Sequence, residues 1–225
     1  MSQIAENLAV VKERIANAAV KAGRSPESVK LVAVTKTVDV SQMREAIAAG
    51  VTDVGENYVQ GAEKKWQELG DIVKWHFIGH LQKNKAKAAV TFSDLIHSVD
   101  SIELAREIGR RAVAIGKVQD VLVEVKVSAE ATKFCVDPAK AIDFAGEIAG
   151  VMGLQVLGFM GMAPFFSNPE GTRPYFGELR ELWGKLPEEQ RRYLSMGMTS
   201  DFEVAIEEGA NMVRIGTAIF GLRAT

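Results

Sequence analysis

Apolar residues along the chain follow two alternating spacings. From Ile4 to Ala18 they recur every three or four positions, which predicts an amphipathic helix that ends near Gly23. Short valine-rich and leucine-rich runs then alternate with further segments of helical periodicity, and such runs are typical of buried strands. The predicted strands lie within residues 30–36, 52–57, 73–80, 94–100, 118–127, 154–163, 193–198 and 211–221.

This order, one extra helix and then about eight strand–helix units, predicts an α/β fold with a parallel sheet. Eight such units close into a TIM-type (β/α)8 barrel, which typically needs about 250 residues. A chain of 225 residues is compact for that fold, and an open doubly wound sheet is the alternative. No linker or composition shift divides the chain, so we expect residues 1–225 to form a single domain.

Composition excludes several classes of protein. The formal net charge of -2 gives no overall positive field for nucleic acid, and no segment is long and apolar enough to cross a membrane. Cys135 is the only cysteine, so an intrachain disulfide is excluded and a reducing cytoplasm fits best. His76 and His80 have the spacing of a helical zinc pair, but they lie in a predicted strand, where four residues span about 13 Å.

In a barrel of this type, chemistry belongs at the carboxyl ends of the strands, where the βα loops converge. Those ends carry Lys36, Glu56, Asn57, His80, Met160, Met162, residues 195–200 and residues 214–217.

Lys36 ends an apolar run, and a lysine is costly to bury. If the first strand alternates regularly, Val32, Val34 and Lys36 share the face that fills the barrel, and the amine rises into the mouth. An amine in that position is suited to attack a carbonyl and form a Schiff base. The simpler interpretation is a strand-end lysine whose ammonium lies in solvent.

The last two strand ends have the features of a phosphate site. The backbone amides of Gly216 and Thr217, with the hydroxyls of Thr217 and Ser200, lie after the two strands whose loops often bind phosphate in such barrels. Tight turns alone also explain the glycines. Arg214 lies inside the last strand and needs a partner if it points inward; a ring nitrogen, a carboxylate or a structural ion pair would each serve.

A lysine for an aldehyde, a phosphate cradle and an arginine for a ring nitrogen together describe pyridoxal 5′-phosphate. The chain resembles the pyridoxal phosphate homeostasis protein family, which is similar in fold to the N-terminal barrel domain of alanine racemase. The resemblance runs over nearly the whole sequence, through the motifs LVAVTK, GENYVQ, WHFIGHLQKNK, GFMGMAP, SMGMTSD and VRIGTAIFG.

The resemblance implies a role for each residue of the predicted site. Lys36 is the expected Schiff-base lysine, Ser200, Gly216 and Thr217 match phosphate-contacting positions, and Arg214 resembles the arginine that faces the pyridine nitrogen. An arginine there weakens the ring as an electron sink, which suits a carrier or a racemase better than a transaminase. Further pocket residues implied by the resemblance are Asn57, Ser195, His80 and Met198.

The resemblance also implies a function in the cytoplasm. We expect a monomeric, non-catalytic protein that holds pyridoxal phosphate on Lys36 and takes part in the homeostasis of vitamin B6 and of amino and keto acids, with apo forms of pyridoxal-phosphate enzymes as partners. The alternative is a low-activity amino-acid racemase. Two features depart from the relatives: the chain ends where alanine racemase continues into a second domain, and Phe134 and Cys135 stand where we expect glycine.

Overall fold

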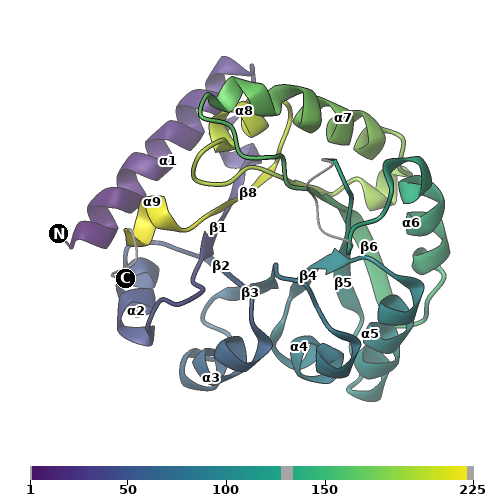
Figure 1. Cartoon of the computed structure of the whole chain (residues 1–225). Coiled ribbons are helices and arrows are strands. Elements are labelled where there is room, and N and C mark those ends of the chain that lie inside the picture. Colours follow the sequence, from purple (N-terminus) through teal and green to yellow (C-terminus); the bar gives the residue numbers. More distant parts are fainter. Residues whose placement is uncertain (1, 128–133, 222–225) are drawn as a thin grey trace.

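The computed structural model describes residues 2–127 and 134–221, and these form a closed barrel (Figure 1). The strands follow one another around the barrel in chain order, each parallel to its neighbour, and the last pairs with the first. The TIM-barrel prediction is therefore confirmed. The strands are β1 (Lys30–Val34), β2 (Asp53–Glu56), β3 (Lys74–Phe77), β4 (Leu95–Val99), β5 (Gln119–Glu124), β6 (Leu154–Met160), β7 (Tyr193–Ser195) and β8 (Met212–Ile215).

Helices surround the barrel as an outer ring (Figure 1). They are α1 (Gln3–Lys21), α2 (Val40–Ala48), α3 (Val59–Leu69), α4 (Ala86–Phe92), α5 (Ile102–Ala114), α6 (Ala141–Ala149), α7 (Arg173–Gly184), α8 (Phe202–Glu207) and α9 (Thr217–Phe220). Local sequence fixes some of their starts. Asp39 caps α2 by accepting a hydrogen bond from the Gln42 amide at 2.8 Å, while the Gln42 side chain accepts from the Asp39 amide.

The extra N-terminal helix completes the outer ring. α1 lies beside α8 and α9 (Figure 1), and Asn7 donates to the Ile219 carbonyl of α9 at 3.0 Å. Arg14 forms a bidentate pair with Glu203 of α8, at 2.7 and 2.9 Å. Because α9 has only one turn, α1 covers the wall that a full-length eighth helix would otherwise protect.

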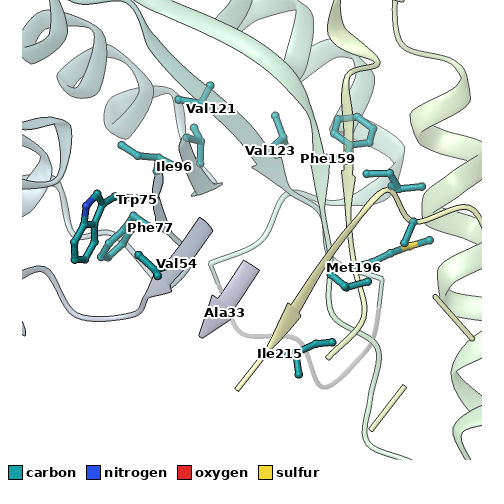
Figure 2. Close-up of a cluster of buried hydrophobic side chains, with 14 of the residues drawn as sticks. Ala33, Val54, Trp75, Phe77, Ile96, Val121, Val123, Phe159, Met196 and Ile215 are labelled. Carbon is teal, nitrogen blue, oxygen red and sulfur yellow. The ribbon is translucent and has the colours of Figure 1, made fainter. Parts of the chain in front are cut away.

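Two apolar layers enclose the strands. The outward layer faces the helices, and Figure 2 shows it as a belt that includes Ala33 of β1, Trp75 and Phe77 of β3, and Phe159 of β6. A smaller set fills the barrel interior: Val32, Leu95, Leu122, Leu157, Met160 and Met212. Inward Val32 and outward Ala33 alternate on β1, as the period of two requires, whereas the register shifts within β6, where Leu157 faces inward and Phe159 faces outward. Among the described residues, no helix has the length and apolar character needed to cross a membrane.

The structure differs from the sequence prediction at two strand ends. β1 stops at Val34, so Lys36 lies in the turn that follows and not on the strand itself. Thr37, the residue after Lys36, has a φ of 67°, in the left-handed region, so the backbone turns directly after Lys36. β8 likewise stops at Ile215, and the segment predicted to continue as strand and turn forms α9.

Strands β6 and β7 approach each other closely at Gly158. Its φ is 144°, and a Cβ at this position would lie 1.8 Å from the Tyr193 carbonyl oxygen. We expect Gly158→Ala to reduce the free energy of unfolding by about 3 kcal/mol or more, because strand β7 must move. Urea denaturation measures this. Gly146→Ala in α6, where a Cβ meets nothing within 4 Å, is the matched control and should leave stability unchanged or raised; equal effects of the two variants would contradict the prediction.

Candidate functional site

Lys36 lies at the mouth of the barrel, just beyond the carboxyl end of β1, and its side chain is half-buried. A buried cluster holds the turn before it: the Thr35 hydroxyl donates to Glu56 at 2.7 Å. Lys65 of α3 donates to the same Glu56 oxygen and to the Thr35 carbonyl, each at 2.7 Å. This cluster and the left-handed Thr37 together define the path of the backbone on both sides of Lys36.

Arg214 projects into the barrel interior from β8 and is only 4% exposed. Its Nη1 donates to the Ser195 hydroxyl at 2.6 Å and its Nη2 donates to the Gly161 carbonyl at 3.1 Å. No carboxylate of the described residues forms an ion pair with it, and burial lowers its pKa to about 10 despite the charges of Glu124 and Asp201. A buried guanidinium with only uncharged partners has N–H groups left to bind a ligand.

The predicted phosphate residues lie on two neighbouring loops. Gly216 precedes α9, and a Cβ there would lie 3.3 Å from the Val34 carbonyl oxygen at the end of β1, so only a small residue fits this approach. Thr217 begins α9, where the first amides of a helix have no partner within it. Both Thr217 and Ser200 are exposed and accessible to a ligand.

The loop after β7 has a fixed shape. Asp201 accepts a hydrogen bond from the Met198 amide at 2.6 Å, and burial raises the pKa of Asp201. Gly197 has a φ of 91°, and a Cβ on it would approach within 2.6 Å of the Ala205 side chain. Met198 is 36% exposed, whereas Ser195 is fully buried and contacts Arg214. The structure thus brings Ser195 and Arg214 into direct contact.

Asn57 and His80 lie on another part of the rim. Both line a pocket of about 480 Å³, and the buried Asn57 Oδ1 atom has no hydrogen-bond partner among the residues that the structure describes. His80 is exposed; its ring stacks on Phe134 with centroids 4.0 Å apart, and its Nδ1 lies 3.4 Å from Asp100. His80 therefore shares a pocket with Asn57 and interacts with Phe134 and Asp100. Part of the loop after β5 lies outside the described residues.

Sequence reasoning missed Glu124, the last residue of β5. It is buried in the same region, where burial raises its pKa to about 7 although a hydrogen bond from Cys135 and the charge of Arg214 act in the opposite direction. The alternation in VQDVLVEV contained the signal, because Asp120 and Glu124 share the inward strand face with Leu122. Within residues 2–127 and 134–221, no group of three or more metal-binding side chains comes together.

Comparisons with known proteins show the family and the fold of the chain. The family model described as "Alanine racemase, N-terminal domain" matches residues 1–224. The "Pyridoxal phosphate homeostasis protein" of Aquifex aeolicus is 46% identical over 222 residues, which are 97% of each chain. PipY of Synechococcus elongatus, whose structure was solved with PLP bound, has 37% sequence identity to this chain. The two structures superpose with a TM-score of 0.85 over 97% of this chain and 100% of the PipY chain. Alanine racemase from Corynebacterium glutamicum shares the fold, with a TM-score of 0.75 and 16% sequence identity. The match covers 98% of this chain and 60% of the racemase chain.

Glu124 gives this end of the barrel a pH dependence that stability measurements can detect. The folded-state pKa of Glu124, about 7, lies above the ordinary value of 4.5. The folded protein therefore binds the proton more tightly than the unfolded chain, and the stability that this contributes is fully present below pH 4.5 and is lost as the pH rises to about 7. We expect a decrease of roughly 3 kcal/mol in the free energy of unfolding over that interval, and Glu124→Gln should remove it. Urea denaturation at a series of pH values measures this decrease.

The control is Glu188→Gln, which changes an exposed glutamate on the outside of the barrel. That variant should keep the pH dependence of the wild type. The same slope in Glu124→Gln as in the wild type would contradict the assignment.

Proposed function

The chain belongs to the alanine racemase N-terminal domain family and, within it, to the pyridoxal phosphate homeostasis proteins, and from this membership we propose that it binds pyridoxal phosphate through a covalent bond to Lys36. The protein holds the cofactor and releases it to other proteins, without substantial catalysis. It thereby takes part in the homeostasis of pyridoxal phosphate and of the amino and keto acids whose enzymes depend on it.

The observation that carries this proposal is the buried Arg214 with no charged partner among the described residues. Its guanidinium donates to a hydroxyl and to a carbonyl, and it has further N–H groups for an acceptor in the mouth of the barrel. A pyridine nitrogen is an uncharged acceptor of the required kind. The register supports the match, because Arg214 pairs with Val32 across β8 and β1, and Lys36 follows Val32 by four residues.

The other residues of the mouth fit the remaining parts of the cofactor. Pyridoxal phosphate supplies an aldehyde that condenses with amines and an aromatic ring that withdraws electrons. Lys36 offers the amine. Ser200, Thr217 and the amides that head α9 offer donors for the phosphate, and the unpartnered Asn57 Oδ1 accepts a hydrogen bond.

The same residues support a carrier and not an efficient enzyme. Arg214 leaves a ring nitrogen unprotonated, which weakens the electron withdrawal that carbanion chemistry requires. A racemase also needs an acid or base on each face of the substrate carbon. Lys65 is held by Glu56 and the Thr35 carbonyl, and Glu124 is held by Cys135, so both groups already have partners.

A weak racemase is the second candidate, and Glu124 is the observation that favours it. A carboxyl group whose pKa lies at about 7 is suited to exchange protons near neutrality. Its proximity to Arg214 would place it near the bound ring.

The first test is the absorption spectrum of purified protein with added pyridoxal phosphate. We expect the visible band of lysine-bound cofactor in the wild type and its loss in Lys36→Ala, because no other amine replaces Lys36. Lys74→Ala, which changes an exposed lysine at the opposite end of the barrel, is the control and should keep the band. A wild-type protein without the band would overturn the proposed function.

Two assays on the loaded protein then separate the two candidates. Transfer of cofactor to an apo form of a pyridoxal-phosphate enzyme, without detectable racemisation of alanine, supports the carrier. Racemisation that depends on both Lys36 and Glu124 supports the second candidate and contradicts the first.

A further inference from the structure

A series of buried polar side chains crosses the barrel interior from Arg214 to Asp53. Arg214 donates to the Ser195 hydroxyl, which lies 3.1 Å from His97 Nδ1. His97 Nε2 lies 2.9 Å from His76 Nδ1, and His76 Nε2 lies 2.9 Å from Asp53 Oδ1. The five residues come from β8, β7, β4, β3 and β2, and none is more than 4% exposed.

Asp53 is the anionic end of this series. Besides His76, Lys30 donates to its carboxylate at 3.0 Å and Thr52 donates at 2.8 Å. Burial alone would raise the pKa of Asp53, but these hydrogen bonds outweigh it and lower the pKa to about 2. At neutral pH the Asp53 carboxylate is therefore ionised and only accepts hydrogen bonds.

An ionised Asp53 requires a proton on His76 Nε2, and the direction of the other hydrogen bonds follows when His76 carries no second proton. His76 Nε2 must carry a proton in order to donate to Asp53, so in neutral His76 the Nδ1 atom is an acceptor. His97 Nε2 then donates to His76. Burial holds the pKa of His97 well below its ordinary value, so this imidazole is neutral, its Nδ1 is bare, and it accepts the Ser195 hydroxyl proton. The Ser195 lone pairs are left to accept from Arg214.

The opposite arrangement leaves a proton without an acceptor. If His76 carried a second proton, it would donate to His97, and His97 Nδ1 would then donate to Ser195. The Ser195 oxygen would accept two hydrogen bonds, and its own buried proton would find no acceptor among the hydrogen bonds of the described residues. Only the arrangement with donors directed from Arg214 toward Asp53 satisfies every group.

We propose that Asp53, His76 and His97 are positioning residues for the cofactor site: they orient the Ser195 hydroxyl so that its lone pairs face Arg214, and thereby fix the guanidinium toward the bound ring. This inference rests on the proposed function, because it takes Arg214 as the group that meets the ring nitrogen. The series reaches a second pocket of about 410 Å³ at the opposite end of the barrel, which Asp53 and His76 line. Changes to Asp53 or His76 at that end therefore alter cofactor binding without touching the cofactor, whereas changes to pocket residues outside the series do not.

The interior also shows that the polar series is not a packing requirement. Six apolar side chains fill the remainder of the same space: Val32, Leu95, Leu122, Leu157, Met160 and Met212. Two imidazoles in this environment cost desolvation that apolar residues of similar volume would avoid. The oriented hydrogen bonds offset that cost only while the whole series is complete.

A double-mutant cycle tests the coupling between the two ends. We expect Asp53→Asn to weaken pyridoxal phosphate binding about tenfold, because an amide at this position no longer demands a proton from His76 and the series loses its direction. In a Ser195→Ala background, where the series is already broken, the same change should have less than about a twofold effect. Absorbance titration of each variant with pyridoxal phosphate gives the affinities.

The control for the cycle is Asp120→Asn, at a half-buried carboxylate that lines the same pocket and takes no part in the series. It should leave the affinity unchanged in both backgrounds. Equal effects of Asp53→Asn in the two backgrounds, or an equal loss in Asp120→Asn, would overturn the inference and leave the proposed function intact. Failure of the wild type to bind pyridoxal phosphate would overturn both.

A second measurement needs neither variants nor cofactor. The chain has three histidines, so ¹⁵N-histidine NMR spectra of the wild type are simple to assign. We expect the Nε2–H tautomer with a bare Nδ1 at both His76 and His97, and exposed His80, which takes no part in the series, serves as the internal comparison. A proton on His97 Nδ1, or a charged His97 at neutral pH, would contradict the direction of the series.

Discussion

The buried guanidinium of Arg214 is the constraint on which the rest of the mouth depends. A cation taken out of water costs several kcal/mol unless the protein compensates it, and Arg214 has no ion pair within the described residues. Compensation comes from the Ser195 hydroxyl on β7 and the Gly161 carbonyl after β6. The environment of one side chain thus depends on the relative positions of three consecutive strands, β6, β7 and β8.

Barrel closure brings Arg214 and Lys36 together. The register that pairs Val32 with Arg214 across β1 and β8 places the end of the first strand beside the end of the last. α1 protects this junction, because its side chains bind α8 and α9 where the final helix is short. The first helix and the last loop, which are farthest apart in sequence, therefore support the same part of the site.

Periodicity was sufficient to predict the barrel and the residues at its mouth. The alternation of strands and helices is a local property, and the carboxyl ends of parallel strands must meet at one face. The turn at Lys36 was not predictable, because the strand end depends on the contacts of Thr35 with Glu56 and of Lys65 with both. The joining of His76 to His97 was also hidden, since it depends on the register of two neighbouring strands and not on any motif in either.

Sequence reasoning missed Glu124 for a different reason. Its alternation with Leu122 was visible in the sequence. A carboxyl group at an inward strand position contradicts the apolar pattern of a core, however, and the pattern alone does not show which neighbours accommodate it. Cys135 and Arg214, which act against the effect of burial on its pKa, come from other segments of the chain. Inward polar residues are therefore the part of a barrel that sequence patterns locate but do not explain.

The separation of charges in the barrel agrees with holding a cofactor instead of activating it. Arg214 is at the mouth and ionised Asp53 is at the opposite end, with Ser195, His97 and His76 between them. In the proposed arrangement these hydrogen bonds transmit orientation, whereas moving a proton along them would deprive the Ser195 hydroxyl of His97 as its acceptor. The guanidinium consequently keeps its protons and acts as a fixed donor. Under the proposed function, a fixed donor at this position would bind the ring nitrogen without protonating it, and the ring would be held in place with little electron withdrawal.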